Sequence, residues 1–393
     1  SGQRSGARRG CTMVTVTSTS QNYMFGDAKI IVIKVGSSLL VDEDQNAINT
    51  AWLSGIATDI ARLKAAGKDV VVVSSGAIAL GRRLLKINHN KLKLQEKQAA
   101  AATGQVLLAH AWMDALGAHQ VQTAQILLSP DDTETRRKHL NARTTMMALL
   151  QLNAVPVVNE NDTVATAEIR FGDNDRLAAR VAAMIGADFL VLLSDVDGLY
   201  TANPNGDNNA THIGAIAQIT PDIMAMAGPA NAAYASGGMV TKLEAARIAT
   251  SAGCQMIICN GQSPAPLSRL EAGAKCTIFA AALSPHTARK QWIAGALTPK
   301  GTIRIDDGAA RALRAGRSLL PAGVIAVSGQ FERGDLIEIE DSAGLVIGHG
   351  LSSYGHKDAM AIRGHKSNEI ESVLGYRERD EMIHADNLVM SDS

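Results

Sequence analysis

Ala154-Val155-Pro156-Val157-Val158 is a short apolar run that leads directly into the polar stretch Asn159-Glu160-Asn161-Asp162. The apolar run predicts a buried strand, and the polar residues predict a loop at its carboxyl end. In an open α/β sheet, the ligand crevice lies outside the carboxyl ends of the strands. Amides and carboxylates in such a loop suit a small ligand that carries an ammonium group or hydroxyls. We therefore expect these residues to line a binding site.

A second polar stretch, Gly172-Asp173-Asn174-Asp175, begins after only nine intervening residues. Asn, Asp and Gly are also the residues of ordinary turns, where they bond their own backbone. Two such stretches so close together favour a binding site over a pair of simple turns.

Strand-like apolar runs alternate with longer helical patterns on both sides of these stretches. The sequence predicts strands at residues 30–35, 70–74, 121–128, 154–158, 189–193 and 256–259, and helices at residues 49–66, 99–116, 141–152, 176–185 and 241–251. This alternation predicts a mostly parallel sheet with helices on both faces, a three-layer αβα sandwich.

The pattern changes after about residue 285. Short strands are predicted at residues 302–305, 323–328, 336–340 and 345–349, with a helix at 309–315. Closely spaced strands of this kind predict a small β-barrel-like domain. We expect a leader at 1–28, the main domain at 29–284, a linker at 285–298, the second domain at 299–380 and a tail at 381–393.

Composition limits the classes of function. The length of 393 residues predicts about two to three domains, and 46% hydrophobic with 19% charged residues is typical of a globular protein. With 38 basic and 38 acidic residues, no global charge attracts nucleic acid or lipid. No apolar run approaches the ~20 residues that span a bilayer. The first 28 residues lack the apolar core of a secretory signal, so they predict a disordered leader or cloning remnant, with an organelle-targeting peptide as the less favoured alternative.

The cysteines are few and scattered. Cys11, Cys254, Cys259 and Cys276 contain no C-x-x-C pair, which argues against a zinc knuckle or a disulfide framework. Their usage is typical of a reducing cytoplasm.

Lys34 lies near the end of the first predicted strand and is followed by Gly36-Ser37-Ser38. Burying a lysine costs several kcal/mol unless it meets an anion. The side chain could instead extend to solvent, but the small residues that follow favour an anion site. A second loop, Ser74-Ser75-Gly76-Ala77, also follows a strand, and its free amides suit a phosphate or carboxylate.

A third loop, residues 236–242, opens the helix predicted near Thr241 and carries Lys242. Glycine amides at a helix N-terminus bind anions, although a flexible linker is the alternative. The Walker pattern is absent, and G-x-G-x-x-G is missing from the first strand–helix junction. Ser194 and Asp195 end another strand, where ribose or adenine contacts or a simple Asx-turn are both consistent with the sequence.

Together these segments resemble the amino acid kinase family, in particular its members that phosphorylate the side chain of L-glutamate. The C-terminal segment is similar to a PUA domain, and the residues that carry this similarity are Ser318–Val324 and Phe331–Asp335. The shared segments of the main domain cover roughly residues 29–283 in the family's order, and they are Ile33–Ser38, Ser75–Ala79, Leu140–Arg143, Val157–Asp162, Gly172–Asp175, Asp195–Tyr200 and Gly237–Lys242.

The resemblance implies ATP- and Mg²⁺-dependent phosphorylation of the side-chain carboxylate of L-glutamate, which gives γ-glutamyl phosphate for proline synthesis. In the family's roles, Lys34 and Lys242 contact the ATP phosphates and Asp175 orients both lysines. The residues implied to hold glutamate are Ser75, Asp162 and Asn174, and those implied to line the nucleotide site are Lys34, Ser194, Asp195, Ser236, Gly237, Gly238, Met239, Val240, Thr241 and Lys242. No residue is implied as a metal ligand. Asp162 suits the ammonium group of glutamate, although the sequence does not separate amino from carboxylate contacts.

Two positions depart from the family pattern. Ala235-Ser236 replaces the usual Gly-Thr of the nucleotide loop, and alanine adopts positive φ less freely than glycine. Ser194 replaces a common Thr but keeps its hydroxyl.

The resemblance also implies feedback inhibition by proline and a homo-oligomer, a dimer or tetramer. Another acyl-phosphate-forming amino acid kinase is the nearest alternative. RNA binding through the PUA domain is a second alternative, with Arg311, Arg314 and Arg317 as a candidate basic face that is more often simply solvated. A scaffolding role without catalysis is disfavoured because both lysines and Asp175 are present.

Overall fold

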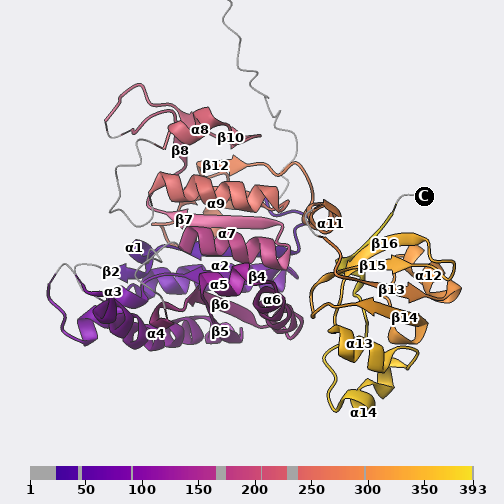
Figure 1. Ribbon diagram of the computed structural model, residues 1–393. Coiled ribbons are helices and arrows are strands. Elements are labelled where there is room, and N and C mark those ends of the chain that lie inside the picture. Colours follow the sequence, from indigo (N-terminus) through magenta and orange to yellow (C-terminus); the bar gives the residue numbers. More distant parts are fainter. Residues whose placement is uncertain are drawn as a thin grey trace, which may run out of the picture.

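The computed structural model describes residues 24–42, 47–89, 92–164, 174–204, 206–227, 238–295 and 298–391. An N-terminal domain built on a large sheet is followed by a smaller C-terminal domain with its own sheet (Figure 1). Several predictions from the sequence fall on residues outside these ranges, namely most of the leader 1–28, Cys11, Gly172, Asp173, Ala235, Ser236 and Gly237.

The large sheet has eight strands in the order β10-β12-β11-β7-β1-β4-β6-β5. Every pairing is parallel except that of β11 with β12, so the predicted, mostly parallel sheet is confirmed. The strand bounds are β1 Ile30–Val35, β4 Asp69–Ser74, β5 Thr123–Leu128, β6 Val155–Glu160, β7 Phe189–Ser194, β10 Ala215–Ile216, β11 Gln255–Asn260 and β12 Cys276–Phe279. Strand β1 lies in the middle, between β4 and β7.

Helices pack against both faces of this sheet because the central strands are apolar on both sides. On β1, Ile31 and Ile33 join one buried cluster while Val32 joins the other. The first cluster includes α2 (Thr50–Ala65) and α4 (Leu94–Gly117), and the second includes α7 (Asn174–Ile185) and α9 (Met239–Ser251). The predicted three-layer sandwich is confirmed.

Helix α3 (Ala77–Leu84) was not predicted, and it crosses α4 at two glycines. A Cβ on Gly104 would lie 1.8 Å from the Ala77 carbonyl oxygen, and one on Gly81 would lie 1.7 Å from the Ala100 carbonyl oxygen. Only glycine permits so close an approach of two backbones. The crossing holds the loop before α3 close to the middle of α4.

Shorter elements complete the N-terminal domain. They are α1 Ser37–Leu40, β2 Val41–Asp42, β3 Ala47–Ile48, α5 Pro130–Glu134, α6 Arg136–Gln151, η1 Asp162–Val164, β8 Leu199–Tyr200, β9 His212–Ile213, α8 Pro221–Ala225 and α10 Pro266–Glu271.

The C-terminal domain contains a five-stranded sheet in the order β14-β13-β15-β16-β17, which confirms the predicted second domain with a small sheet. Its elements are β13 Gly301–Ile305, α12 Asp307–Arg314, η2 Pro321–Gly323, β14 Val324–Gly329, β15 Leu336–Glu340, β16 Val346–Leu351, α13 His356–Ile362, η3 Ser367–Glu369, α14 Ile370–Leu374, η4 Ala385–Asn387 and β17 Leu388–Met390.

Two expected boundaries differ from the observed elements. The predicted tail, residues 381–393, supplies β17, which pairs with β16, and it buries Met382 and Ile383 in the core of this domain. The predicted linker, residues 285–298, begins with α11 (Pro285–Gly295), whose Ile293 packs on Leu336 and Leu351. Burial of these apolar side chains orders both segments.

Candidate active site

Two lysines from distant parts of the chain meet at one carboxylate. Lys34 Nζ lies 2.6 Å from Asp175 Oδ1, and Lys242 Nζ lies 3.0 Å from Asp175 Oδ2. All three charges are buried, because Lys34 is 8% exposed, Asp175 2% and Lys242 6%. Lys34 comes from the carboxyl-terminal half of β1, while Asp175 and Lys242 come from the first turns of α7 and α9. The predicted catalytic residues are thus brought together.

The balance of charge in this group is positive. Burial by itself raises the pKa of Asp175, but the two ammonium groups outweigh burial, so the pKa of this carboxyl lies below its usual range. Two ammonium groups around one carboxylate leave one net positive charge at the edge of the sheet where ligands bind. Thr241 Oγ1 adds a hydroxyl 3.2 Å from Asp175 Oδ2. The group is suited to bind a polyphosphate.

A second ion pair joins the same two helices. Arg176 Nε donates to Glu244 Oε2 at 2.6 Å, one residue beyond Asp175 on α7 and two beyond Lys242 on α9. This pair is partly exposed. It is a second contact between α7 and α9, beside the Asp175–Lys242 pair.

A chain of side-chain amides lies beside the lysines. Asn174 Nδ2 donates to Ser75 Oγ at 2.7 Å and to Asn159 Oδ1 at 2.9 Å. Asn159 Nδ2 in turn donates to Gln105 Oε1 at 2.8 Å. The predicted substrate residues Ser75 and Asn174 are therefore in contact, and Gln105 and Asn159 support them.

The direction of this chain is fixed by the backbone. Asn174 Nδ2 also lies 3.2 Å from the Ser74 carbonyl oxygen, which can only accept a hydrogen bond. The nitrogen of Asn174 must therefore face Ser74, and its Oδ1 faces away. Among the described residues, this buried Oδ1 has no hydrogen-bond partner. A buried acceptor without a donor is costly, so Asn174 Oδ1 is available to accept from a ligand.

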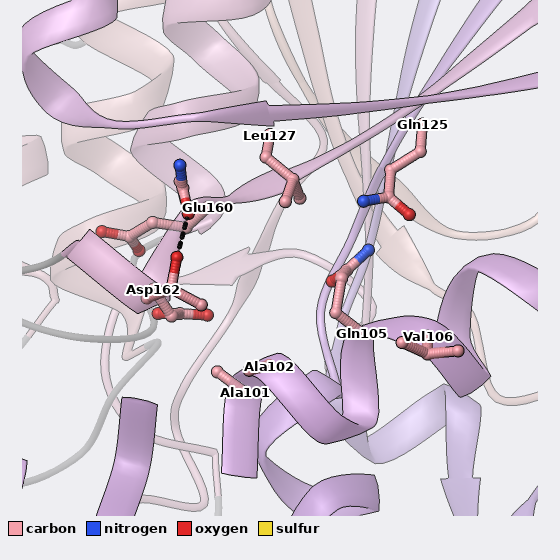
Figure 2. Close-up of a pocket in the computed structure, with 10 residues that line it drawn as sticks. Ala101, Ala102, Gln105, Val106, Gln125, Leu127, Glu160 and Asp162 are labelled. Atoms are coloured by element: carbon pink, nitrogen blue, oxygen red, sulfur yellow. Dashed lines mark hydrogen bonds between the residues drawn. The ribbon is translucent and has the colours of Figure 1, made fainter. Parts of the chain in front are cut away.

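Asp162 lies in the wall of a cavity of about 220 Å³. Figure 2 shows Asp162 and Gln105 among the side chains that line it, Asp162 from η1 and Gln105 from α4. Asp162 is buried, and burial raises its pKa to about 6. Because Gln105 both lines the cavity and bonds Asn159, the cavity adjoins the amide chain that ends at Asn174.

The predicted nucleotide residues that the structure describes lie along the same edge of the sheet. Ser194 ends β7, next to β1, and its hydroxyl donates to Asp195 Oδ1 at 2.9 Å. Gly238 is the residue before α9, whose first turn contains Met239, Val240 and Thr241.

Sequence reasoning missed Gln105 and placed Asn159 in a loop. Asn159 instead lies inside β6, one residue before its end, where it pairs with Leu127 of β5 and is 3% exposed. Its position close to Asp162 in the sequence was a usable signal that Asn159 belongs to the site. Gln105 lies inside a long helix, and only the folded chain brings it to Asn159.

Comparison with known proteins agrees with this geometry. Residues 29–260 match the amino acid kinase family, and residues 301–374 match the PUA domain. The chain belongs to the amino acid kinase family, as predicted from its motifs. The described helices include none long and apolar enough to cross a membrane.

Within the family, the chain is similar over nearly its whole length to glutamate 5-kinases. It is 59% identical over 363 residues to that of Paramagnetospirillum magneticum, which covers 92% of this chain and 98% of the relative. It is 57% identical over 361 residues to that of Rhizobium etli, which covers 92% of each. It is 55% identical over 364 residues to that of Rhodopseudomonas palustris, which covers 93% of this chain and 97% of the relative.

Proposed function

We propose that this chain transfers the terminal phosphoryl group of ATP to the side-chain carboxylate of L-glutamate. The product is γ-glutamyl phosphate, and the reaction is the first step of proline biosynthesis. The observation that carries the proposal is the buried Lys34–Asp175–Lys242 group next to Asn174 Oδ1, an acceptor without a partner among the described residues. Similarity to glutamate 5-kinases over more than nine-tenths of the chain supports the same substrate.

The residue types suit this reaction. The nucleophile is a carboxylate, which is ionised at neutral pH because Glu titrates near ~4.3, so no general base is needed. A carboxylate oxygen forms a bond to the terminal phosphorus, the bond from that phosphorus to the bridging oxygen breaks, and ADP leaves. The obstacle is the approach of two anions, which fixed positive charge relieves. Lys34 and Lys242 supply it, and Asp175 holds them in place.

Mg²⁺ is proposed to enter with the nucleotide. Among the residues that the structure describes, no group of three or more His, Cys, Asp or Glu side chains could hold a metal ion by itself. The phosphate oxygens of ATP are therefore proposed as the main ligands of Mg²⁺. When bound, the ion supplies further positive charge at the transferring group.

The amide chain and Asp162 are proposed to hold glutamate. Its ammonium group would donate to Asp162 and to Asn174 Oδ1, the buried acceptor left without a partner among the described residues. Ser75 Oγ accepts from Asn174, so its own hydrogen is directed to the substrate carboxylate. Ser194, Asp195 and residues 236–242 are proposed to line the nucleotide site at the end of β7 and the start of α9.

The test of the proposed function is ATP turnover with L-glutamate and Mg²⁺, with hydroxylamine present to trap the acyl phosphate as the γ-hydroxamate. Parallel reactions contain N-acetylglutamate, aspartate or no amino acid. Hydroxamate from L-glutamate alone is the expected result. Preferential use of N-acetylglutamate would assign the chain to another acyl-phosphate-forming kinase, and no product from any substrate would contradict the proposal.

Asp162→Ala should raise KM for glutamate roughly 10- to 100-fold, because a charge-assisted hydrogen bond is worth about 1.5–3 kcal/mol.

In the wild-type protein, kcat/KM should fall below about pH 6, since burial raises the pKa of Asp162 to about 6 and protonation removes the charge that binds the ammonium group. Rates measured from pH 5 to 8 check both points. An inflection near pH 6 that persists in Asp162→Ala would contradict this role.

Gln105→Leu should raise KM for glutamate about tenfold and leave kcat within about twofold. The change removes the acceptor of Asn159 Nδ2, which leaves a buried donor unpaired and frees the amide chain that orients Asn174. Steady-state kinetics with varied glutamate measure the effect. Gln95→Leu is the matched control, because Gln95 is an exposed glutamine on the same helix, α4, and does not line the cavity. Equal KM values in the two variants would exclude a positioning role for Gln105.

Proline is proposed as a feedback inhibitor that competes with glutamate, because both ligands present an ammonium and a carboxylate group to the same residues. Proline should raise the apparent KM for glutamate and leave the maximal rate unchanged. Kinetics at several fixed proline concentrations decide this, and an apparent KM that does not change at saturating proline would refute competition.

A homo-oligomer, a dimer or tetramer, is also proposed. Helix α4, beside the edge strand β5, carries large apolar side chains in solvent, with Val106 70% and Met113 49% exposed. Such residues next to a free sheet edge are typical of subunit contacts. Sedimentation of the intact chain at several concentrations measures its mass.

Three further assignments are proposed. A cytoplasmic location is supported by the free thiols of Cys254, Cys259 and Cys276. RNA binding by the C-terminal domain is not favoured, because Arg311 and Arg314 lie on the solvent face of α12 and Arg317 lies beyond its end. We propose residues 29–284 as the kinase domain and place the start of the PUA domain near residue 299.

A further inference from the structure

Four arginines gather where the kinase domain meets the C-terminal domain. Arg136 and Arg143 come from α6, Arg289 from α11, and Arg379 from the segment after α14. Both α6 and α11 lie at the end of the kinase domain that faces the PUA domain (Figure 1). Burial first, and then the neighbouring Arg143, lower the pKa of Arg289 to about 10, with Arg136 and Arg379 contributing as well. The four guanidinium groups therefore repel one another.

Two of these arginines hold the domains together. Arg379 Nη2 donates to Thr144 Oγ1 of α6 at 2.8 Å. Arg289 Nη2 donates to Asn387 Oδ1 at 2.6 Å, and its Nε donates to the Asp386 carbonyl oxygen at 3.3 Å. These contacts account for Arg289 and Arg379 as parts of the domain interface.

The other two arginines have buried donors that find no acceptor among the described residues. Arg136 Nε, Arg136 Nη2 and Arg143 Nε are buried and have no hydrogen-bond partner among the described residues. Arg136 lies over the ring of Trp292, 5.7 Å from its centroid, which supplies no hydrogen-bond acceptor in the ring plane. A guanidinium carries five donors, and buried charged donors without acceptors are costly. Packing of the two domains by itself does not explain two such residues.

The neighbouring carboxylates do not balance the charge. Asp335 attracts Arg136 electrostatically, but it also forms an ion pair with Lys300 at 3.0 Å. Asp386 attracts Arg143 and Arg289 electrostatically. Its side chain is nevertheless 52% exposed, and its Oδ2 lies 3.6 Å from His384 Nδ1. Two carboxylates, each beside another basic group, face four guanidinium groups, so the cluster is strongly positive.

We propose that this arginine cluster binds a phosphate-type anion, either inorganic phosphate or the phosphate group of a small monoester. A phosphate dianion presents several oxygens and two charges, and the forked guanidinium matches it better than any other side chain does. Arg143 is only partly buried and can turn toward an anion without breaking a hydrogen bond among the described residues. The segment Leu140–Arg143, which the proposed reaction does not use, is thereby given a role.

A bound anion would join the two domains. It would neutralise repulsion among residues of α6, α11 and the C-terminal segment, all of which meet at this interface. Phosphate should therefore raise the melting temperature of the intact chain more than chloride does at equal ionic strength.

The experiment compares Arg143→Gln with Arg137→Gln. Both remove one positive charge from α6, but Arg137 is exposed. Isothermal titration with inorganic phosphate should show a site in the wild-type protein and in Arg137→Gln, and about tenfold weaker binding at that site in Arg143→Gln, as expected for loss of one charge-assisted hydrogen bond. Phosphate bound between Lys34 and Lys242 is common to all three proteins and does not affect the difference.

Thermal unfolding in phosphate and in chloride supplies the second readout. Arg143→Gln should melt at or above the wild-type temperature in chloride, because repulsion is relieved, and should lose much of the phosphate-dependent rise. Equal phosphate effects in the two variants would overturn the proposal, and so would a lower melting temperature of Arg143→Gln in chloride without any change in phosphate binding. Glycerol phosphate in place of phosphate distinguishes a monoester from the free ion. Binding of a short RNA, with no response to either phosphate, would also overturn it.

Discussion

Replacing Lys242 with alanine is expected to lower kcat on the order of 10²- to 10³-fold, the loss typical of one charge-stabilising donor. The Lys242 ammonium group, at the start of α9, lies 3.0 Å from Asp175 Oδ2, and Lys34 lies on the other side of the same carboxylate. From this position we propose that it acts on the transferring phosphoryl group, where charge develops only in the transition state. KM for glutamate should change by less than about threefold, because Ser75 and Asn174, which we propose to hold the substrate, belong to a separate set of hydrogen bonds.

Steady-state kinetics with glutamate and ATP varied in turn measure this separation. Arg247→Ala is the matched control, since it removes a positive charge from the same helix at an exposed position. The control should keep the wild-type kcat. A Lys242→Ala variant that kept kcat and lost affinity for glutamate would contradict the assignment of this lysine to the phosphates.

The fold was largely predictable because its strands are buried on both faces. A strand such as β1 must be apolar at positions that contact a helix layer, so it is visible in the sequence as a short apolar run. Lys34 interrupts that run, and burial of an isolated charge is so costly that the sequence alone indicated an anion site. Helix α3 gave no comparable signal, because its packing on α4 depends on Gly81 and Gly104, and glycine carries no hydrophobic pattern.

The parts of the site that sequence could not predict depend on partners that are distant in the chain. Gln105 is a polar residue in a helix until the fold places it 2.8 Å from Asn159. Arg136 and Arg289 of the domain interface lie 153 positions apart in the sequence. Each of these arginines, considered by itself, is typical of a solvated helix face. Only their joint burial, with donors left unpaired among the described residues, distinguishes them from ordinary surface charges.

Asp175→Asn should have the largest effect on stability. The change keeps the volume of the side chain but leaves two buried ammonium groups without their shared carboxylate. Removing one partner of a buried ion pair costs about 3–5 kcal/mol, because the remaining charge is uncompensated. The lysines would also move apart, and a displacement of about 1 Å can lower kcat roughly 100-fold. Urea unfolding and turnover with saturating substrates measure the two losses.

Glu244→Gln is the matched comparison, because it is also isosteric and also removes a carboxylate that joins α7 to α9. The Arg176–Glu244 pair is partly exposed, with side chains 37% and 26% accessible, and such pairs contribute about 0–1 kcal/mol. The two variants therefore break the same helix contact at different depths. If the loss of stability in Asp175→Asn were no greater than in Glu244→Gln, the lysines would be solvated rather than held by Asp175. The role of Asp175 as the residue that positions both lysines would then be wrong.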